Sequence, residues 1–306
     1  MHNIFITGSE YHCNMVKKIL SDNPEINFTD DLKSADILYV IFGPGISKET
    51  LKYWILTNKP ILIHWIGKDT FFLEGDRKYD IFSKGYYTNK LKKIILNARY
   101  LFNNVKFISS APWLAKRVNK LTNKDTDYLV LTSIDKNKLL TPRKKRKYDF
   151  ISYIPINDFE LYYGNEFLSI IENNPKREFC IVCPDLHNLE DWPYKKYSNL
   201  KIQTRTTQKG FYECLNNSKS FIRLKNGGDA IALSVLEALA HGCNVVWNLD
   251  FKFCSYETRE SFKHNYQKYF VNDFEINYSA IKFIKENYDI TAWQKDFISL
   301  VNKILK

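Results

Sequence analysis

The sequence predicts an α/β fold of two Rossmann-like domains facing each other across a cleft. Short apolar runs alternate with segments of helical periodicity, and the alternation stops and restarts around one basic, proline-containing stretch. The chain has 306 residues, and a single hydrophobic core usually stops growing near roughly 250–300 residues. We therefore expect two cores, each a parallel sheet covered by helices.

Apolar, strand-like runs fall into two series. The first series comprises Asn3–Thr7, Ile37–Phe42, Ile61–Trp65 and Val105–Ser109. Helical periodicity separates these runs, as in residues 11–20 and 47–57. The second series comprises residues 150–153, 179–183, 200–203, 220–224 and 244–247. Residues 278–305 have helical periodicity again and predict a pair of helices that closes the second domain.

A basic stretch separates the two series. Residues 141–147 read Thr-Pro-Arg-Lys-Lys-Arg-Lys, in which the proline disfavours a helix and the like charges repel one another. We expect a solvated linker at 142–148 between an N-terminal domain, 1–141, and a C-terminal domain, 149–306. A nuclear-localisation or nucleic-acid-binding signal is the alternative for such a run.

Composition excludes several classes of protein. Mean hydropathy is −0.37, and the longest apolar runs fall far short of the ~20 residues of a membrane-spanning helix. The first residues lack the pattern of a secretory signal, so we expect a cytoplasmic protein. Six cysteines are too few for a disulfide scaffold in this length. Cys180-Ile-Val-Cys183 has no second pair at metal-ligand spacing, so we interpret it as a buried strand and expect no metal.

The excess of positive over negative charge lies entirely in the first half. Residues 1–147 hold 26 Lys and Arg against 14 Asp and Glu, whereas residues 148–306 hold 19 against 20. A field of one sign attracts anionic partners, such as nucleic acid, an acidic membrane surface or a phosphorylated acceptor. A lysine-rich surface that serves solubility explains the same count.

Residues 221–247 are the most informative segment, because they combine a strand, a glycine loop, a helix and another strand. The loop Asn226-Gly227-Gly228 lets a ligand approach the backbone, and the free amides at the start of the next helix suit a diphosphate. We expect Gly228, Ala230 and Ile231 to line this anion site. Asp229 lies at the predicted helix start, where an N-cap is the ordinary interpretation.

Glu237 follows Asp229 by eight residues. On one helix, two such side chains project within roughly 80° of each other and about 12 Å apart along the axis. The first can bind sugar hydroxyls and the second the hydroxyls of a ribose. Glu237 lies in an apolar stretch, where an unpaired buried charge would cost several kcal/mol, so we expect it to bind a ligand.

At these residues the sequence resembles the group 1 family of retaining glycosyltransferases, whose fold is the two-domain GT-B type. That family has Glu, seven residues and Glu, followed by Ala-Leu-Ala-x-Gly-x-x-Val-Val. Here Asp229 and Glu237 hold the acidic positions, and residues 238–246 read Ala-Leu-Ala-His-Gly-Cys-Asn-Val-Val. Residues 64–69, 110–117 and 152–164 are similar to further segments of a subgroup, in the family's order, so the resemblance covers nearly the whole chain.

The resemblance implies transfer of a hexose from a nucleotide sugar, such as a UDP- or GDP-hexose, to a hydroxyl, with retained configuration and without cofactor or metal. The family's usual cations are missing from residues 154–158, so Arg205, Arg223 and Lys225 either substitute in holding the diphosphate or the activity is weak or absent. Glu237 would hold the ribose. Asp229 would be a catalytic residue.

Three further candidates lie in the N-terminal half. His64 closes a strand-like run and is expected to face the cleft, although a strand-end histidine is more often structural. Asp69 is a candidate for substrate contact or for a helix cap. Gly8 follows the first strand, where its backbone can approach the donor phosphates. Because no Gly-x-Gly-x-x-Gly is present, the sequence argues against NAD.

In enzymes of this family the acceptor meets the N-terminal domain, whose charge predicts an anionic acceptor. Possible anionic acceptors are lipid-linked sugars at the inner face of a membrane, acidic glycans and nucleic acids. A lipid-linked acceptor would bring the protein into peripheral contact with the membrane. Three other functions stay open: a nucleic-acid-binding protein, a sugar-nucleotide epimerase of the same fold and a non-catalytic relative that only binds the donor.

Overall fold

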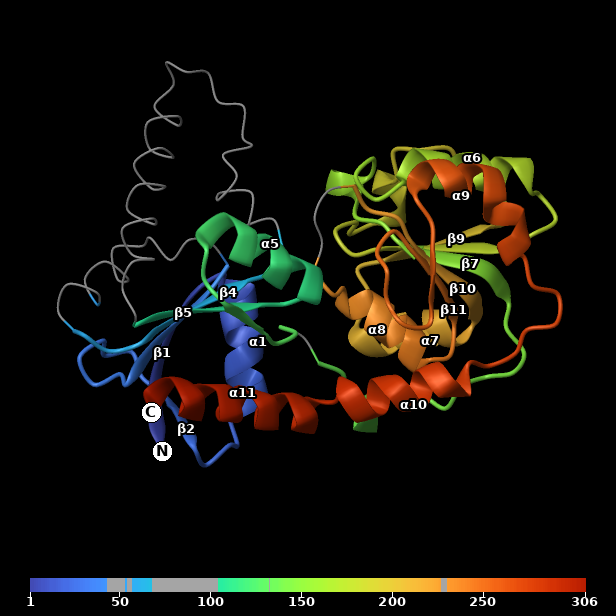
Figure 1. The fold of residues 1–306 in the computed structure, drawn as a ribbon. Helices are drawn as coiled ribbons and strands as arrows, with labels where there is room; N and C mark the ends of the chain where they lie inside the picture. The colour runs from blue at the N-terminus through green and yellow to red at the C-terminus, as the bar shows by residue number, and fades with distance from the viewer. Residues whose placement is uncertain (43–52, 54–56, 68–103, 132, 227–229) are drawn as a thin grey trace, which may run out of the picture. The chain divides into compact units, whose positions relative to one another are not determined.

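The chain forms two compact units, each with its own sheet, in a computed structural model that describes residues 1–42, 53, 57–67, 104–131, 133–226 and 230–306 (Figure 1). The first unit comprises Met1–Ser133, Gly228–Ile231 and Ile290–Lys306. The second comprises Ile134–Gly227 and Ala232–Asp289. In the part of the chain that is described, no helix is both long enough and apolar enough to span a membrane.

The first unit contains a six-stranded parallel sheet in the order β2-β1-β3-β4-β5-β6. Its strands are β1 (His2–Gly8), β2 (Ile26–Phe28), β3 (Ile37–Ile41), β4 (Ile61–Trp65), β5 (Val105–Ser109) and β6 (Thr126–Tyr128). Every residue of β3 and β4 is buried, as continuous apolar runs in a parallel sheet require. The four predicted strands of this half are confirmed, and the two edge strands β2 and β6 are additional.

Three described helices accompany this sheet: α1 (Glu10–Leu20), α5 (Pro112–Thr122) and α11 (Ile290–Leu305). The helix expected at 47–57 lies almost wholly outside the described residues.

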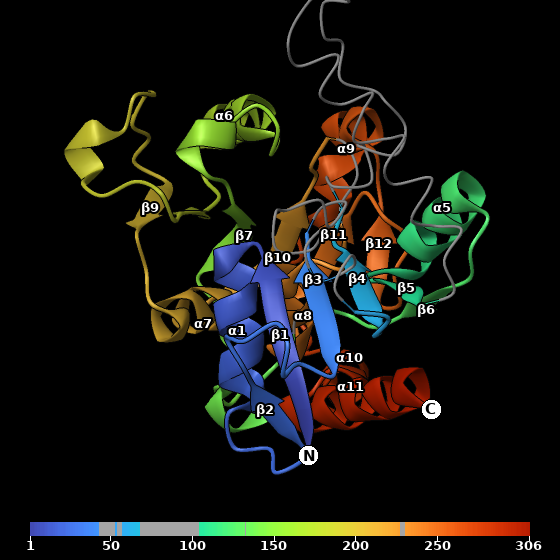
Figure 2. The same ribbon diagram turned by 90° about the vertical axis from the view of Figure 1, so that its left-hand side faces the viewer.

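Helix α11 differs from expectation, because it belongs to the first unit rather than closing the second. Trp293 Nε1 donates to the carbonyl of Val130 at 2.5 Å, and the Phe297 ring lies 5.3 Å from that of Tyr39. Helix α11 also lies beside α1, where Gln294 Nε2 donates to the Ile19 carbonyl (Figures 1 and 2). An apolar stripe shows that a helix packs, but it does not show which sheet the helix covers.

The second unit contains a six-stranded parallel sheet in the order β12-β11-β10-β7-β8-β9. Its strands are β7 (Tyr148–Tyr153), β8 (Phe179–Cys183), β9 (Leu200–Thr204), β10 (Ser218–Arg223), β11 (Asn244–Trp247) and β12 (Cys254–Tyr256). The chain builds outward from β7 to β9 and then returns to β10 on the other side of β7. The direction of winding therefore reverses between β7 and β10.

Helices α6 (Gly164–Asn173), α7 (Gln208–Asn216), α8 (Leu233–Ala240), α9 (Arg259–Asn265) and α10 (Tyr278–Asn287) complete the second unit, with short 3₁₀ turns such as η3 (Ile156–Asp158). Its core is rich in aromatic side chains, and the rings of Phe150 and Phe270 stack at 4.5 Å. Cys180 and Cys183 are buried in β8, which confirms the interpretation of this CxxC as part of a core strand.

The basic run expected to form a linker at 142–148 belongs to the second unit, and the chain passes between the units at 133/134, 227/228, 231/232 and 289/290. Arg146 is buried and donates to the carbonyls of Ser218 at 2.6 Å and His241 at 2.5 Å. His241 directly follows α8, and Arg146 also donates to Leu215 in the last turn of α7. A cation is favourable at helix C-termini, which offsets the repulsion expected within the run.

Candidate functional site

The reversal of winding in the second sheet defines the candidate site. Ligands of open α/β sheets bind outside the carboxyl ends of the strands at such a switch point. Here the two strands that flank it, β7 and β10, end at Tyr153 and Arg223. The segments that follow these two strands therefore form the place where a ligand is expected.

Two predicted cations lie together at this point. Arg223 and Lys225 are each only 7% exposed, and both approach the ring of Tyr162, Arg223 Cζ at 4.7 Å and Lys225 Nζ at 5.5 Å from its centre. Asn248, which follows β11, donates from Nδ2 to the Lys225 carbonyl at 2.7 Å. The sheet and one aromatic ring thus hold the two positive charges beside each other.

A polar cavity of about 450 Å³ adjoins this pair along the chain. Asn226 follows Lys225. Its backbone N–H donates to the carbonyl of Leu161, the residue before Tyr162, at 2.9 Å. This bond joins the segment after β7 to the segment after β10 at the switch point. The cavity is lined by Glu160, Leu161, Asn165, Glu166, Asn226 and Arg259.

The start of α6 shapes the cavity. Tyr163 takes a left-handed conformation with φ of 68°, and a side chain at Gly164 would lie 2.4 Å from the Phe159 ring. Glycine therefore lets the helix begin against that ring, which places Glu166 at the cavity. Arg259, the first residue of α9, pairs with the Glu166 carboxylate and donates to the Glu160 carbonyl at 3.0 Å.

Glu237 lies on α8 and is 5% exposed. Its carboxylate accepts a hydrogen bond from Gln208 Nε2 at 3.3 Å and interacts with the Tyr212 hydroxyl, both on α7. Burial raises the pKa of Glu237 to about 7, although these two hydrogen bonds lower it. Among the described side chains, no cation lies within ion-pair distance of it. The described residues therefore give the Glu237 carboxylate neutral hydrogen-bond partners but no counter-charge.

The predicted pairing of Asp229 with Glu237 on one helix is wrong, because α8 begins only at Leu233. Ala232 caps the helix in an extended conformation, with φ of −76° and ψ of 127°. Ala230 and Ile231 precede the helix and group with the first unit. The side chain of Ile231 is buried. Gly228, Asp229 and Asp69 lie outside the described residues.

Arg205 does not join the other two cations. It is exposed after β9, and its guanidinium lies 3.0 Å from His187 Nδ1. Strands β7 and β8 separate β9 from β10, which places the ends of these strands about 14 Å apart at ordinary strand spacing. Strand order, which the sequence does not reveal, accounts for this difference from expectation.

The segment after β7 binds a carboxylate of the chain itself. Asp185 accepts from the amides of Ile156 at 2.7 Å and Asn157 at 3.0 Å. Burial raises the pKa of Asp185, but these backbone hydrogen bonds outweigh it and lower the pKa overall. Sequence reasoning missed Asp185, although a carboxylate just beyond a buried strand is a usable signal. It also missed Tyr162 and Arg259, which no local pattern marks, and it named Asn226 only as part of the glycine loop.

His64 is completely buried within the first unit rather than facing open space. Its Nε2 lies 3.0 Å from the Leu129 carbonyl, which can only accept, so Nε2 carries the proton and Nδ1 accepts from the Tyr39 hydroxyl at 2.7 Å. Burial lowers the pKa of His64 to about 3. The geometry is that of a neutral, structural histidine.

Gly8 has a packing role. Its φ is 122°, and a side chain there would lie 1.8 Å from the Ile41 carbonyl oxygen on β3. Glycine is therefore required for β1 to lie against β3, whatever else its backbone does. Within the described ranges, no three His, Cys, Asp or Glu side chains gather as a metal site requires.

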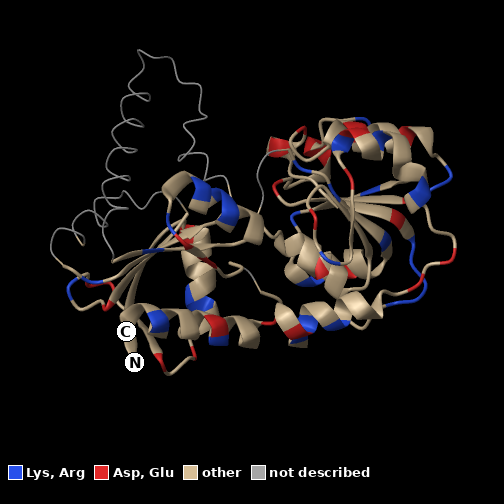
Figure 3. Ribbon diagram, viewed as in Figure 1, with Lys and Arg blue, Asp and Glu red and all other residues tan. Residues whose placement is uncertain are grey.

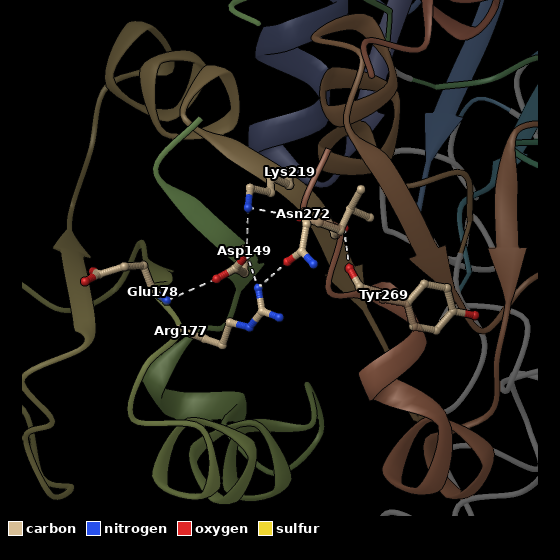
Figure 4. Close-up of polar contacts among 8 residues, drawn as sticks. Asp149, Arg177, Glu178, Lys219, Tyr269 and Asn272 are labelled. Atoms are coloured by element: carbon tan, nitrogen blue, oxygen red, sulfur yellow. Dashed lines mark hydrogen bonds and ion pairs between the residues drawn. The ribbon is translucent and has the colours of Figure 1, made fainter. Parts of the chain in front are cut away.

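The amino-terminal ends of the strands of the second sheet lie on the side away from the candidate site. They carry a separate group of charged residues (Figure 4). The Asp149 carboxylate at the start of β7 lies 2.9 Å from Lys219 Nζ and 3.6 Å from Arg177, and it accepts from the Glu178 amide at 3.3 Å. Lys219 also donates to the Val271 carbonyl at 3.0 Å. This network joins the starts of three strands.

Comparison with known proteins supports the fold. No protein-family model and no curated relative matches the sequence. Among solved structures, sucrose-phosphate synthase from Thermosynechococcus elongatus matches at a TM-score of 0.69 and 8% identity over 99% of both chains. Anabaena HepE, in complex with UDP and glucose, matches at 0.67 and 9% identity over 99% of this chain and 100% of its own.

Longer proteins match as well. S. aureus TarM, in complex with fondaparinux, α-GlcNAc-glycerol and UDP, matches at a TM-score of 0.55 and 13% identity over 87% of this chain. The present chain spans only 55% of TarM. At these identities the likeness concerns the fold. The protein has the α/β fold of two Rossmann-like units found in GT-B glycosyltransferases.

Proposed function

We propose that this protein is a glycosyltransferase that binds a nucleotide-sugar donor at the switch point of its second sheet. One observation carries the proposal: Arg223 and Lys225 lie side by side there, next to a polar cavity of about 450 Å³. HepE, which shares the fold, was solved with UDP and glucose, and the residues of the present site suit the same class of ligand.

The two cations would hold the diphosphate. Its departure develops negative charge, which fixed positive groups in a poorly solvated place stabilise more than water does. Glu237 would hold the ribose. Transfer of a hexose with retained configuration and without metal is part of the proposal and follows from the motif resemblance. In that scheme Asp229 and Asp69 stay candidates for substrate contact.

We extend the proposal to an anionic acceptor on the first unit. Helix α5 carries Lys116, Arg117 and Lys120 without an acidic residue (Figure 3). The residues that form this unit, 1–133, 228–231 and 290–306, hold 22 basic against 15 acidic side chains. A lipid-linked phosphate sugar at the cytoplasmic face of a membrane fits this charge, as does an acidic glycan.

Donor binding tests the proposal. We would titrate UDP, GDP, UDP-glucose and GDP-mannose into the protein and follow its melting temperature, which a ligand of the folded state raises by mass action. Lys225→Met keeps the aliphatic stem and removes the charge, so the affinity should fall about 10- to 100-fold, as expected for one hydrogen bond to a charged group. The matched control is Lys195→Met, which removes an exposed lysine paired with Glu172.

The proposal fails if none of the four compounds stabilises the wild type, or if the two lysine variants bind them equally well. Stabilisation by nucleic acid alone, with affinity that falls steeply with salt, would favour a nucleic-acid-binding protein instead.

A further inference from the structure

We infer that the cavity beside Arg223 and Lys225 holds the sugar ring of the donor, and that Glu160 makes the site select an uncharged hexose over a uronic acid. The inference rests on the proposed donor site and adds the class of sugar. It depends on the charge balance of the cavity and on one carboxylate oxygen that lacks a donor.

Side chains of both signs line the cavity, but they do not cancel. Arg259 pairs with Glu166, so these two charges compensate each other. Among the described residues, the Glu160 carboxylate has one hydrogen-bond partner, Asn165, whose Nδ2 lies 3.4 Å from its Oε1. Within the described part of the chain, no cation lies within ion-pair distance of the Glu160 carboxylate. The cavity therefore carries one net negative charge.

The same lining suits hydroxyl groups. Carboxylates accept from hydroxyls, and the amides of Asn165 and Asn226 can donate or accept. Glu166 Oε2 is shielded from solvent and has no hydrogen-bond partner among the described residues, although Oε1 of the same carboxylate is paired with Arg259. A buried acceptor of this kind is normally satisfied, and a sugar hydroxyl supplies the missing donor.

The arrangement separates the two parts of a nucleotide sugar. A diphosphate would be repelled by the net charge of the cavity and attracted to Arg223 and Lys225. Lys225 and Asn226 are consecutive, as are Leu161 and Tyr162, so the cationic part and the hydroxyl-binding part adjoin on both sides of the switch point. A volume of about 450 Å³ lies within the range of small-ligand sites and accommodates one hexose ring.

Two matched pairs of donors test the inference: UDP-glucose with UDP-glucuronic acid, and GDP-mannose with GDP-mannuronic acid. The members of each pair differ only in carrying CH₂OH or a carboxylate on C5 of the sugar. Affinities would be measured by calorimetry, with UDP and GDP alone as references. For the base that the protein accepts, we expect the neutral sugar to bind about tenfold more tightly, the order of one like-charge contact in a partly solvated site.

Glu160→Gln removes the charge and keeps the shape, so the tenfold ratio should fall towards one while the affinity for the free nucleoside diphosphate changes much less. Glu172→Gln is the matched control, because Glu172 is an exposed carboxylate near the end of α6 that pairs with Lys195 and does not line the cavity. Its ratio should stay near ten.

Equal affinities of the wild type for both members of a pair would overturn the inference and leave the donor site standing. The inference would also be overturned if Glu160→Gln changed the affinity for UDP or GDP alone as much as the affinity for the sugar conjugates. Glu160 would then act on the diphosphate. Failure of every nucleotide to bind would remove the donor site and the sugar assignment together.

Discussion

In the second sheet, the charged side chains around Asp149, at the amino-terminal ends of the strands, have partners of opposite charge, whereas some of those at the carboxyl-terminal ends have none among the described residues. At the amino edge, Asp149 meets Lys219, Arg177 and a backbone amide (Figure 4). At the carboxyl ends of the strands, a solvent-shielded oxygen of Glu166 has no described donor, and no described cation lies within ion-pair distance of the Glu160 carboxylate. Charged groups that stabilise a fold are paired with other groups of the same chain. At a binding site, some polar groups have no partner in the protein and can bind a ligand. This comparison can be tested by substitution.

The largest effect is expected at the amino edge. Asp149→Ala would leave Lys219, largely buried, without its carboxylate, and the loss of one partner of such a pair costs about 3 kcal/mol. Urea denaturation should show this decrease in the free energy of unfolding, while the folded fraction binds nucleotide with unchanged affinity. A loss below about 1 kcal/mol, typical of a surface ion pair, would show that the network is not structural.

Glu237 should make stability depend on pH. Its pKa in the folded protein, about 7, lies above its ordinary value of 4.5. Between these values the folded state binds more protons than the unfolded state, so the free energy of unfolding falls as pH rises and levels off above pH 7. The total is about 3 kcal/mol from pH 4.5 to pH 8.

Glu237→Gln should lack this decrease, so the variant gains stability relative to the wild type as pH rises. Urea denaturation at pH 5, 6, 7 and 8 measures the difference between the two proteins. Parallel curves for the wild type and the variant would show that Glu237 is not the group responsible.

His64 should give a dependence of the opposite sign. Its pKa in the folded protein, about 3, lies below its ordinary value of 6.5. The unfolded state therefore binds more protons as pH falls below 6.5, and stability is lost, by about 2 kcal/mol at pH 5. His64→Gln should lower stability at neutral pH and remove this slope in thermal unfolding. His264→Gln, at an exposed histidine of α9, should keep the slope. Retention of the slope in His64→Gln would contradict the structural role.

Much of the fold could be predicted from the sequence, because strands buried on both faces are continuous apolar runs. All nine predicted strands exist. The three that were missed, β2, β6 and β12, have three residues each and lie at sheet edges, where a strand is too short to show a period. The basic run was misassigned because the repulsion between its charges can be recognised in the sequence. The carbonyls at helix ends that bind Arg146 belong to distant segments, which the sequence does not bring together.

Only those site residues that a pattern in the neighbouring sequence marks could be predicted. Arg223 and Lys225 could be found because they end an apolar strand beside a glycine loop. Arg259 and Tyr162 could not, since their contacts depend on how helices and loops from separate segments meet. The helical spacing assumed between Asp229 and Glu237 failed because α8 begins only at Leu233, and the residue before it is extended.

The position of α11 has a consequence for biosynthesis. The helix that packs beside α1 and against Tyr39 is encoded after the entire second unit. A ribosome therefore exposes the first sheet long before the helix that completes it has been translated. All residues of the second unit, up to Asp289, are translated before this helix, so the second unit can fold before the first is complete.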